Sequence, residues 1–528
     1  MERKTLLAIV VSIAIILAWD YFVLQPRKQQ EPLETPQTLE ETVQQQPVQT
    51  IEPLKVSEIK ETKTPDEIIA VDTDLYRATW SSRGAHLISL QLKKYKVSMA
   101  PDSELVEMVD SPFPVLTMGK EFSDTDLVYE ASEKGSITVA NSSHEIIFTA
   151  QLSPDIILKK IYTFYPQNYL IGYRSMIMNN ANDSKVLQFN TNMDGIFPLD
   201  DKRSRYSFEG PVLLNGKHLE EFKINKIKTP GSYRKFPGEI IWFGFEDKYF
   251  LKAIIPIEAA ETSLTVQRMD SDRVGIVYES PAVTIQPGTS HTQEHVIFAG
   301  PKQLKTLKDS GYSLNKALDF GFFDFIAKPM MIAMNWIYSY IHSYGWSIIL
   351  LTIFIKILLY PLTLKSFTSM KGLQKIQPLM KELQAQYKDD RQKLNQEMMK
   401  LYSEHKINPM GGCLPMVLQI PILFALYRVF LSAIELRHTP FHIVGTWLPD
   451  LSAKDPYYII PIVMGLSQFV QQKMTPTPGD PTQQKMMLMM PIVFTFIFLN
   501  FPSGLVLYWL LSNILSIIQQ VYINRSRK

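Results

Sequence analysis

The sequence predicts a multi-pass α-helical membrane protein with six spans, an all-β sandwich domain and a helical hairpin. Three observations indicate this fold class. Apolar runs of roughly membrane-spanning length occur near the N-terminus and repeatedly after residue 344. Residues 66–310 instead contain short stretches in which apolar and polar residues alternate, as in strands. The segment 365–413 carries nine Lys and Arg residues against five Asp and Glu, which is typical of a cytoplasmic loop.

The first segment, 1–24, is predicted to be a signal-anchor span. Its apolar run follows Arg3 and Lys4 and leads into Trp19 and Asp20 rather than into a cleavage site of small residues. This favours a retained span over a removed signal peptide. Residues 25–65 are rich in Gln, Glu, Pro and Thr, a composition that cannot bury enough apolar surface to offset the entropy of ordering, so we expect a disordered tether.

Short strands are predicted throughout residues 66–310. In 88–93, for example, Ile88, Leu90 and Leu92 alternate with polar residues. Similar runs occur at 75–80, 145–152, 157–165, 170–178, 249–256 and 274–278, with Pro, Gly, Asn and Asp between them. Many short strands at this spacing indicate a β-sandwich or barrel.

A candidate zinc motif of the H-x-x-E-H type lies in this domain, at His291 and His295. Zinc binding requires the two histidines to share one face of a helix, but the motif runs into Val-Ile-Phe and is predicted to be a strand. On a strand the two residues would lie about 13 Å apart, at roughly 3.3 Å per residue. We expect no metal site here and interpret the motif as a solvent-facing strand.

Residues 311–343 are predicted to form an amphipathic helix in the membrane interface. The stretch is dense in aromatic residues and methionine, but Asp324, Lys328 and Pro329 make it a poor span. The next segment, 344–364, is predicted to be the second span, and it carries a lysine, Lys356, near its middle.

A lysine within the bilayer costs at least about 2.5–3.5 kcal/mol, so it usually faces a partner or a watery cavity. Thr352, Lys356 and Tyr360 are spaced by four residues and Thr363 follows by three, which places them on one helical face. The polar face favours a cavity. The alternative is that the lysine extends along the helix to reach the headgroups.

The basic segment 365–413 is predicted to be a hairpin of two helices. Leu373, Ile376, Leu379, Leu383 and Tyr387 form one helical stripe, and Leu394, Met398, Leu401 and His405 form another. Between them, Asp390 is a plausible N-cap. The basic faces could bind acidic partners or RNA, or could simply be solvated.

The remaining predicted segments are a span at 414–435, a periplasmic loop at 436–455, a span at 456–472, a cytoplasmic loop at 473–485, spans at 486–501 and 503–522, and a basic tail at 523–528. Alternation of the spans places the basic segments and both termini in the cytoplasm and the β domain outside. Polar residues recur in these spans at Gln419, Ser467, Gln468, Gln471 and Thr495, and at Tyr508, Ser512, Asn513 and Ser516. Together they could form a hydrated groove around Lys356, or they could serve singly as contacts between helices.

Composition excludes several classes of protein. The net charge of +2 predicts no bulk attraction to nucleic acid. The single cysteine, Cys413, excludes an internal disulfide and a CxxC site. Phosphate-binding loops and dinucleotide fingerprints are absent from the sequence, so we expect no cofactor, no metal and no enzymatic activity.

The C-terminal half resembles the bacterial membrane protein insertase family YidC. The similar stretches are Tyr360-Pro-Leu-Thr, Asn408-Pro-Met-Gly-Gly-Cys-Leu-Pro, Asp455-Pro-Tyr-Tyr-Ile-Ile-Pro-Ile, Gln472-Lys-Met-Thr-Pro, Asp480-Pro-Thr-Gln-Gln-Lys-Met and Phe501-Pro-Ser-Gly-Leu-Val-Leu-Tyr-Trp. They lie in the family's order over about 345–522. The anchor, tether and β domain match the layout of its Gram-negative members.

The resemblance implies a periplasmic β-supersandwich and a function as insertase and chaperone in the bacterial inner membrane. It implies nascent membrane proteins, the Sec translocon, lipids and, weakly through 365–413 and the C-terminal tail, the ribosome as partners. Lys356 stands where the family has a functional arginine, and Thr352, Gln419, Tyr508 and Trp509 match groove positions. Ser512 joins this groove set, and Tyr360 and Arg428 are further candidates. Arg428 could pair with Glu435, or its side chain could extend to the outer headgroups.

Two other functions fit parts of the sequence. A transporter could use Lys356 as a coupling site, although the spans show none of the paired internal repeats typical of transporters. A membrane-bound zinc peptidase could use His291 and His295.

Overall fold

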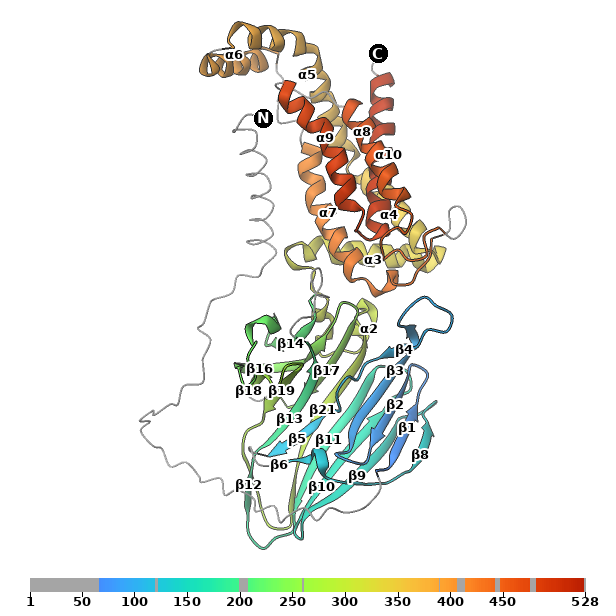
Figure 1. Cartoon of the computed structure of the whole chain (residues 1–528), viewed down its shortest axis with the longest axis vertical. Helices are drawn as coiled ribbons and strands as arrows, with labels where there is room; N and C mark the ends of the chain where they lie inside the picture. Colours follow the sequence, from blue (N-terminus) through green and yellow to red (C-terminus); the bar gives the residue numbers. More distant parts are fainter. Residues whose placement is uncertain are drawn as a thin grey trace, which may run out of the picture. The chain divides into compact units, whose positions relative to one another are not determined.

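The computed structural model describes residues 66–118, 122–198, 208–258, 261–388, 390–405, 414–441, 447–474 and 481–526. The predicted first span and tether, 1–24 and 25–65, lie outside these residues. The described residues fall into two compact units, which divide between Leu318 and Asp319 (Figure 1). The first unit is β-rich and the second is helical.

The β-rich unit contains three sheets. Its strands are β1 (Ile68–Asp72), β2 (Tyr76–Ser81), β3 (His86–Lys96), β4 (Leu105–Glu107), β5 (Val115–Met118), β6 (Phe122–Ser123), β7 (Glu130–Ala131), β8 (Gly135–Thr138), β9 (His144–Ser153), β10 (Ile156–Phe164), β11 (Leu170–Asn179), β12 (Lys185–Leu187), β13 (Phe189–Ile196), β14 (Gly210–Asn215), β15 (His218–Glu221), β16 (Tyr233–Glu246), β17 (Phe250–Pro256), β18 (Glu261–Arg268), β19 (Arg273–Glu279), β20 (Val283–Ile285) and β21 (Thr289–Pro301). Short helices η1 (Asp124–Asp126), η3 (Ile224–Lys226), α2 (Leu304–Asp309) and η4 (Leu314–Ala317) complete it.

The long strand β16 joins the two halves of the largest sheet. Residues 233–239 pair with β18, and residues 240–246 pair with β14 or β17. The faces of the two halves meet, because Tyr278 on β19 contacts His295 on β21 at a ring-centroid distance of 6.1 Å. The five-stranded sheet packs on the same core. The ring centroid of Trp80 on β2 lies 4.8 Å from that of Phe164 on β10. The predicted sandwich is therefore built from aromatic contacts between sheets.

The predicted strands coincide with β2, β3, β9, β10, β11, β17 and β19. The predicted strand at His291 and His295 is also confirmed, as part of β21. Its predicted solvent-facing position is wrong for His295, which is 4% exposed and contacts the rings of Tyr173 and Tyr278. The sequence motif is polar, but inward residues of β21 meet the aromatic rings of neighbouring strands. Burial lowers the pKa of His295 to about 4.

The helical unit consists of η5 (Gly321–Phe323), α3 (Asp324–Ile341), α4 (Tyr344–Leu358), α5 (Tyr360–Gln386), α6 (Arg391–Glu404), α7 (Leu414–Ser432), η7 (Ile434–Leu436), α8 (Ile459–Met474), α9 (Pro481–Phe498) and α10 (Ser503–Ser526). Helix α3 runs across one end of the bundle, and α5 and α6 extend from the other end (Figure 1). Within the bundle, α10 contacts α4, α7 and α8.

In the described part of the chain, one helix is long and apolar enough to cross a membrane by itself, Ser503–Ile523. The pair α4 and α5 would provide a second span, bent by 57°. Two further apolar helices, Gln419–Ser432 and Met487–Phe498, are shorter. The arrangement of six spans stays a prediction.

The predicted helical face from Thr352 to Thr363 is wrong, because the segment 344–364 is not one continuous helix: α4 ends at Leu358 and α5 begins at Tyr360. Pro361 lies in the first turn of α5, where a proline, which lacks an N–H, is well tolerated. In a continuous helix Pro361 would have no N–H to donate to the carbonyl of Ile357, and its ring would clash with that carbonyl, which explains why the helix breaks just before this residue. Tyr360 therefore lies beyond a bend and does not continue the face of Lys356.

Helices α5 and α6 pack through an apolar cluster where the hairpin is predicted. Leu373, Ile376, Met380 and Leu401 are its buried members. The predicted N-cap is confirmed, since the Asp390 side chain accepts a hydrogen bond from the backbone N–H of Lys393 at 3.0 Å. Leu379, however, is exposed, and Met380 takes its place in the cluster.

Gly465 permits the close approach of α8 to α9. A Cβ atom at this position would lie 1.9 Å from Oγ1 of Thr495, whose hydroxyl donates to the carbonyl of Pro491. We expect Gly465→Ala to destabilise the protein by about 1–3 kcal/mol through overpacking, despite the better helix propensity of alanine. Chemical denaturation of the detergent-purified protein measures this loss. The pair Gly465→Ala/Thr495→Ala should recover most of it; an alanine variant as stable as the parent would contradict the close packing.

Candidate functional site

Helix α10 carries a buried polar row. Tyr508, Ser512, Ser516 and Gln520 follow at intervals of four residues, so they share one face of the helix. All four are buried. Polar groups buried in a helix bundle need hydrogen-bond partners, so the row has to be satisfied by neighbouring helices or by water.

Three neighbouring helices provide those partners. Lys356 of α4 donates from Nζ to Oγ of Ser516 at 2.8 Å. Gln419 of α7 donates from Nε2 to Oγ of Ser512 at 2.7 Å. Gln520 itself donates from Nε2 to the carbonyl of Met474 on α8 at 2.7 Å. The polar row thus connects α10 to α4, α7 and α8.

Lys356 is the cation of this site. Its side chain is partly buried, and its hydrogen-bond partner Ser516 is neutral. Among the ion pairs of the described residues, none includes Lys356. A partly buried cation that lacks a carboxylate partner attracts an anion more strongly than an exposed lysine, because the local dielectric constant is lower.

The other predicted site residues differ in their surroundings. Thr352 is 1% exposed, and its hydroxyl donates to the carbonyl of Ile348 at 2.6 Å, so its polar group is satisfied within α4. Tyr508 is buried beside the serines of α10. Trp509 packs instead on α9, with ring centroids 5.9 Å from Phe494 and 5.0 Å from Phe498. Lys356, Gln419 and Ser512 are therefore joined through the row, whereas Thr352 and Trp509 have other contacts.

The predicted pair of Arg428 and Glu435 is absent from the ion pairs of the described residues. Helix α7 ends at Ser432, and Glu435 lies in η7, so the two residues do not share a continuous helical face. Glu435 instead accepts from Nδ2 of Asn335 on α3 at 3.4 Å. Tyr344 of α4 donates to the same asparagine at 3.2 Å. This contact between α3, α4 and η7 was not predicted, because nothing in the local pattern connects residues 100 positions apart.

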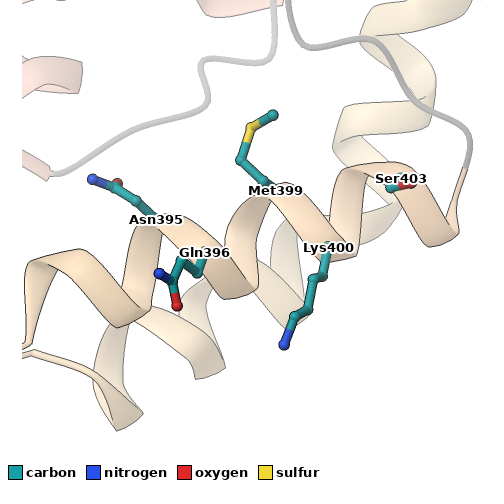
Figure 2. Close-up of a pocket in the computed structure, with 5 residues that line it drawn as sticks. All are labelled: Asn395, Gln396, Met399, Lys400 and Ser403. Carbon is teal, nitrogen blue, oxygen red and sulfur yellow. The ribbon is translucent and has the colours of Figure 1, made fainter.

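A shallow depression lies on the outer face of α6. It is lined by Asn395, Gln396, Met399, Lys400 and Ser403 (Figure 2). Met399 is 63% exposed there, on the face away from the apolar cluster that α6 shares with α5. The described residues contain no group of three or more His, Cys, Asp or Glu side chains that could hold a metal ion.

Two family models match adjoining parts of the chain. The model described as the YidC periplasmic domain matches residues 68–333, and the model described as the 60Kd inner membrane protein matches residues 336–528. The membrane protein insertase YidC of Geotalea daltonii is 40% identical over 539 residues, covering 100% of this chain and 99% of the relative. The membrane protein insertase YidC of Syntrophus aciditrophicus is 40% identical over 554 residues, covering 99% of this chain and 100% of the relative.

Proposed function

This chain belongs to the YidC family of membrane protein insertases, and we propose that it inserts nascent proteins through a polar groove centred on Lys356. It is a membrane protein insertase of the bacterial inner membrane with a periplasmic domain. The observation that supports the groove is the hydrogen-bonded row on α10 with a cation that has a neutral partner.

Insertion proceeds in two steps. The polar tail of a client enters the groove, where side chains and water replace the hydration that the tail would lose in lipid. Lys356 attracts acidic residues of that tail. The apolar span of the client then leaves toward lipid, driven by burial of apolar surface at about 25 cal/mol per Å². The pathway contains no covalent step and needs no cofactor.

The groove fits a topology of six spans. Both termini and the α5–α6 hairpin lie in the cytoplasm, and the β-rich unit lies in the periplasm, as the distribution of Lys and Arg favours. Helix α3 lies in the periplasmic interface, in keeping with its exposed Phe325, Trp336 and Tyr340. The outer face of α6, which exposes Met399, receives the client from the ribosome or beside the Sec translocon.

Site-specific crosslinking to ribosome-stalled clients of increasing length tests this pathway. Photoreactive residues at 419, 508 and 356 should crosslink the client tail, and a probe at 399 should react with shorter clients. Control probes belong at Ile462, Leu466 and Phe496, whose side chains are exposed on α8 and α9. Crosslinks from the controls to the polar tail, with none from 419, 508 or 356, would contradict the groove.

A further inference from the structure

We infer that Ser516 is a positioning residue that fixes the ammonium group of Lys356 for contact with acidic clients. This inference rests on the proposed groove and assigns a residue that controls its client preference. Ser516 lies 160 residues from Lys356 in the sequence and is buried on the inner face of α10.

The hydroxyl hydrogen of Ser516 already has a partner. Oγ donates to the carbonyl of Ser512 at 2.8 Å, one turn earlier in α10. A serine hydroxyl has one hydrogen and two acceptor lone pairs. With the hydrogen directed to its own helix, the oxygen presents only lone pairs to Lys356, and it accepts from Nζ at 2.8 Å.

This geometry orients the cation and leaves its charge intact. A lysine ammonium carries three hydrogens on a flexible four-carbon chain. Among the described residues, Lys356 donates one N–H, to Ser516, so two remain for a carboxylate of the client. An acidic residue at position 516 would instead neutralise the cation, whereas serine holds it and stays neutral.

A second polar contact of α10 provides a matched comparison. Asn513 donates from Nδ2 to Oγ of Ser467 on α8 at 3.1 Å. This bond also connects α10 to a neighbouring helix, but it involves no charged group. Loss of the Ser467 hydroxyl therefore measures what a neutral hydrogen bond between helices contributes.

The test compares two clients that differ only in the tail, with aspartates in one and asparagines in the other. Full-length variants are reconstituted in liposomes, and the ratio of acidic-client to neutral-client insertion is measured. We expect Ser516→Ala to lower this ratio severalfold and Ser516→Thr, which keeps the hydroxyl, to restore it. Ser516→Asp should lower the ratio to that of Lys356→Ala, whereas Ser516→Asn should not. Ser467→Ala should change insertion of both clients equally.

A background variant separates positioning from packing. In Lys356→Ala, the further change Ser516→Ala should leave the ratio unchanged, because there is no ammonium to position. The inference is overturned if Lys356→Ala lowers the ratio and Ser516→Ala does not, or if Ser516→Ala lowers insertion of both clients alike. If Lys356→Ala itself leaves the ratio unchanged, the electrostatic part of the proposed function fails, and the role of Ser516 fails with it.

Discussion

Replacing Lys356 with alanine is expected to lower insertion of a client with an acidic tail by about tenfold, which corresponds to about 1.4 kcal/mol. Two unit charges 4 Å apart interact by about 4 kcal/mol at an effective dielectric constant of 20, and water in the groove screens part of this energy. Because no described carboxylate pairs with Lys356, its charge is available to the client. Lys356→Arg keeps the charge and should keep most of the activity.

The measurement is the initial rate of client insertion into liposomes, with a neutral-tailed client run in parallel. Lys356→Met is the better neutral variant for folding, because methionine has a similar length and is tolerated in apolar surroundings. Lys473→Ala is the matched control, since Lys473 is a cation at the end of α8 that contacts the ring of Phe469. Normal insertion of the acidic client by the two neutral variants, Lys356→Ala and Lys356→Met, would contradict an electrostatic role.

The polar face of α10 could be predicted from the sequence, but its partners could not. Spacing by four residues places Tyr508, Ser512 and Ser516 on one face of any helix. Which helix meets each residue depends on packing between segments far apart in the chain. The bond between Lys356 and Ser516 joins residues separated by 160 positions, so no local pattern could reveal it.

The same division holds in the β-rich unit. Alternation of apolar and polar residues predicts strands well, because successive side chains point to opposite faces of a sheet and one of these faces is buried. Alternation fails where a polar residue points inward to a specific partner. Lys159 and Lys160 are adjacent in β10, and only the folded structure shows that Lys160 is the buried one. His295 was misassigned for this reason.

A buried charge network connects the five-stranded sheet to the largest sheet of the β-rich unit. Asp124 of η1 is fully buried, as are Lys160 of β10 and His86 of β3. Asp124 lies 2.5 Å from Nζ of Lys160 and 3.2 Å from Nε2 of His86. It also accepts from the hydroxyl of Tyr129 at 3.1 Å and from the backbone N–H of Leu116 at 3.0 Å. Burial alone would raise the pKa of Asp124, but the charge of Lys160 and the bond to His86 outweigh burial and hold this pKa below its usual range.

Asp124→Asn is therefore expected to destabilise the β-rich unit by about 3–5 kcal/mol, because it leaves the buried ammonium of Lys160 without its counter-charge. The carbonyls of Gly84 and Pro114, which also accept from Lys160, place the expected loss toward the lower end of this range. Pulse proteolysis of the full-length protein in urea, followed by detection of fragments from residues 66–318, measures the loss.

The double variant Asp124→Asn/Lys160→Met separates charge from packing. It removes both charges while keeping side chains of similar size, so no uncompensated charge remains buried, and the buried uncompensated charge is the main cost of breaking an ion pair. The double variant should therefore be more stable than Asp124→Asn alone. Measured together with Lys160→Met alone, the two variants give the coupling energy between the two side chains. A coupling energy near zero would show that Lys160 does not depend on Asp124. The cost of Asp124→Asn would then lie in the bonds to His86, Tyr129 and Leu116.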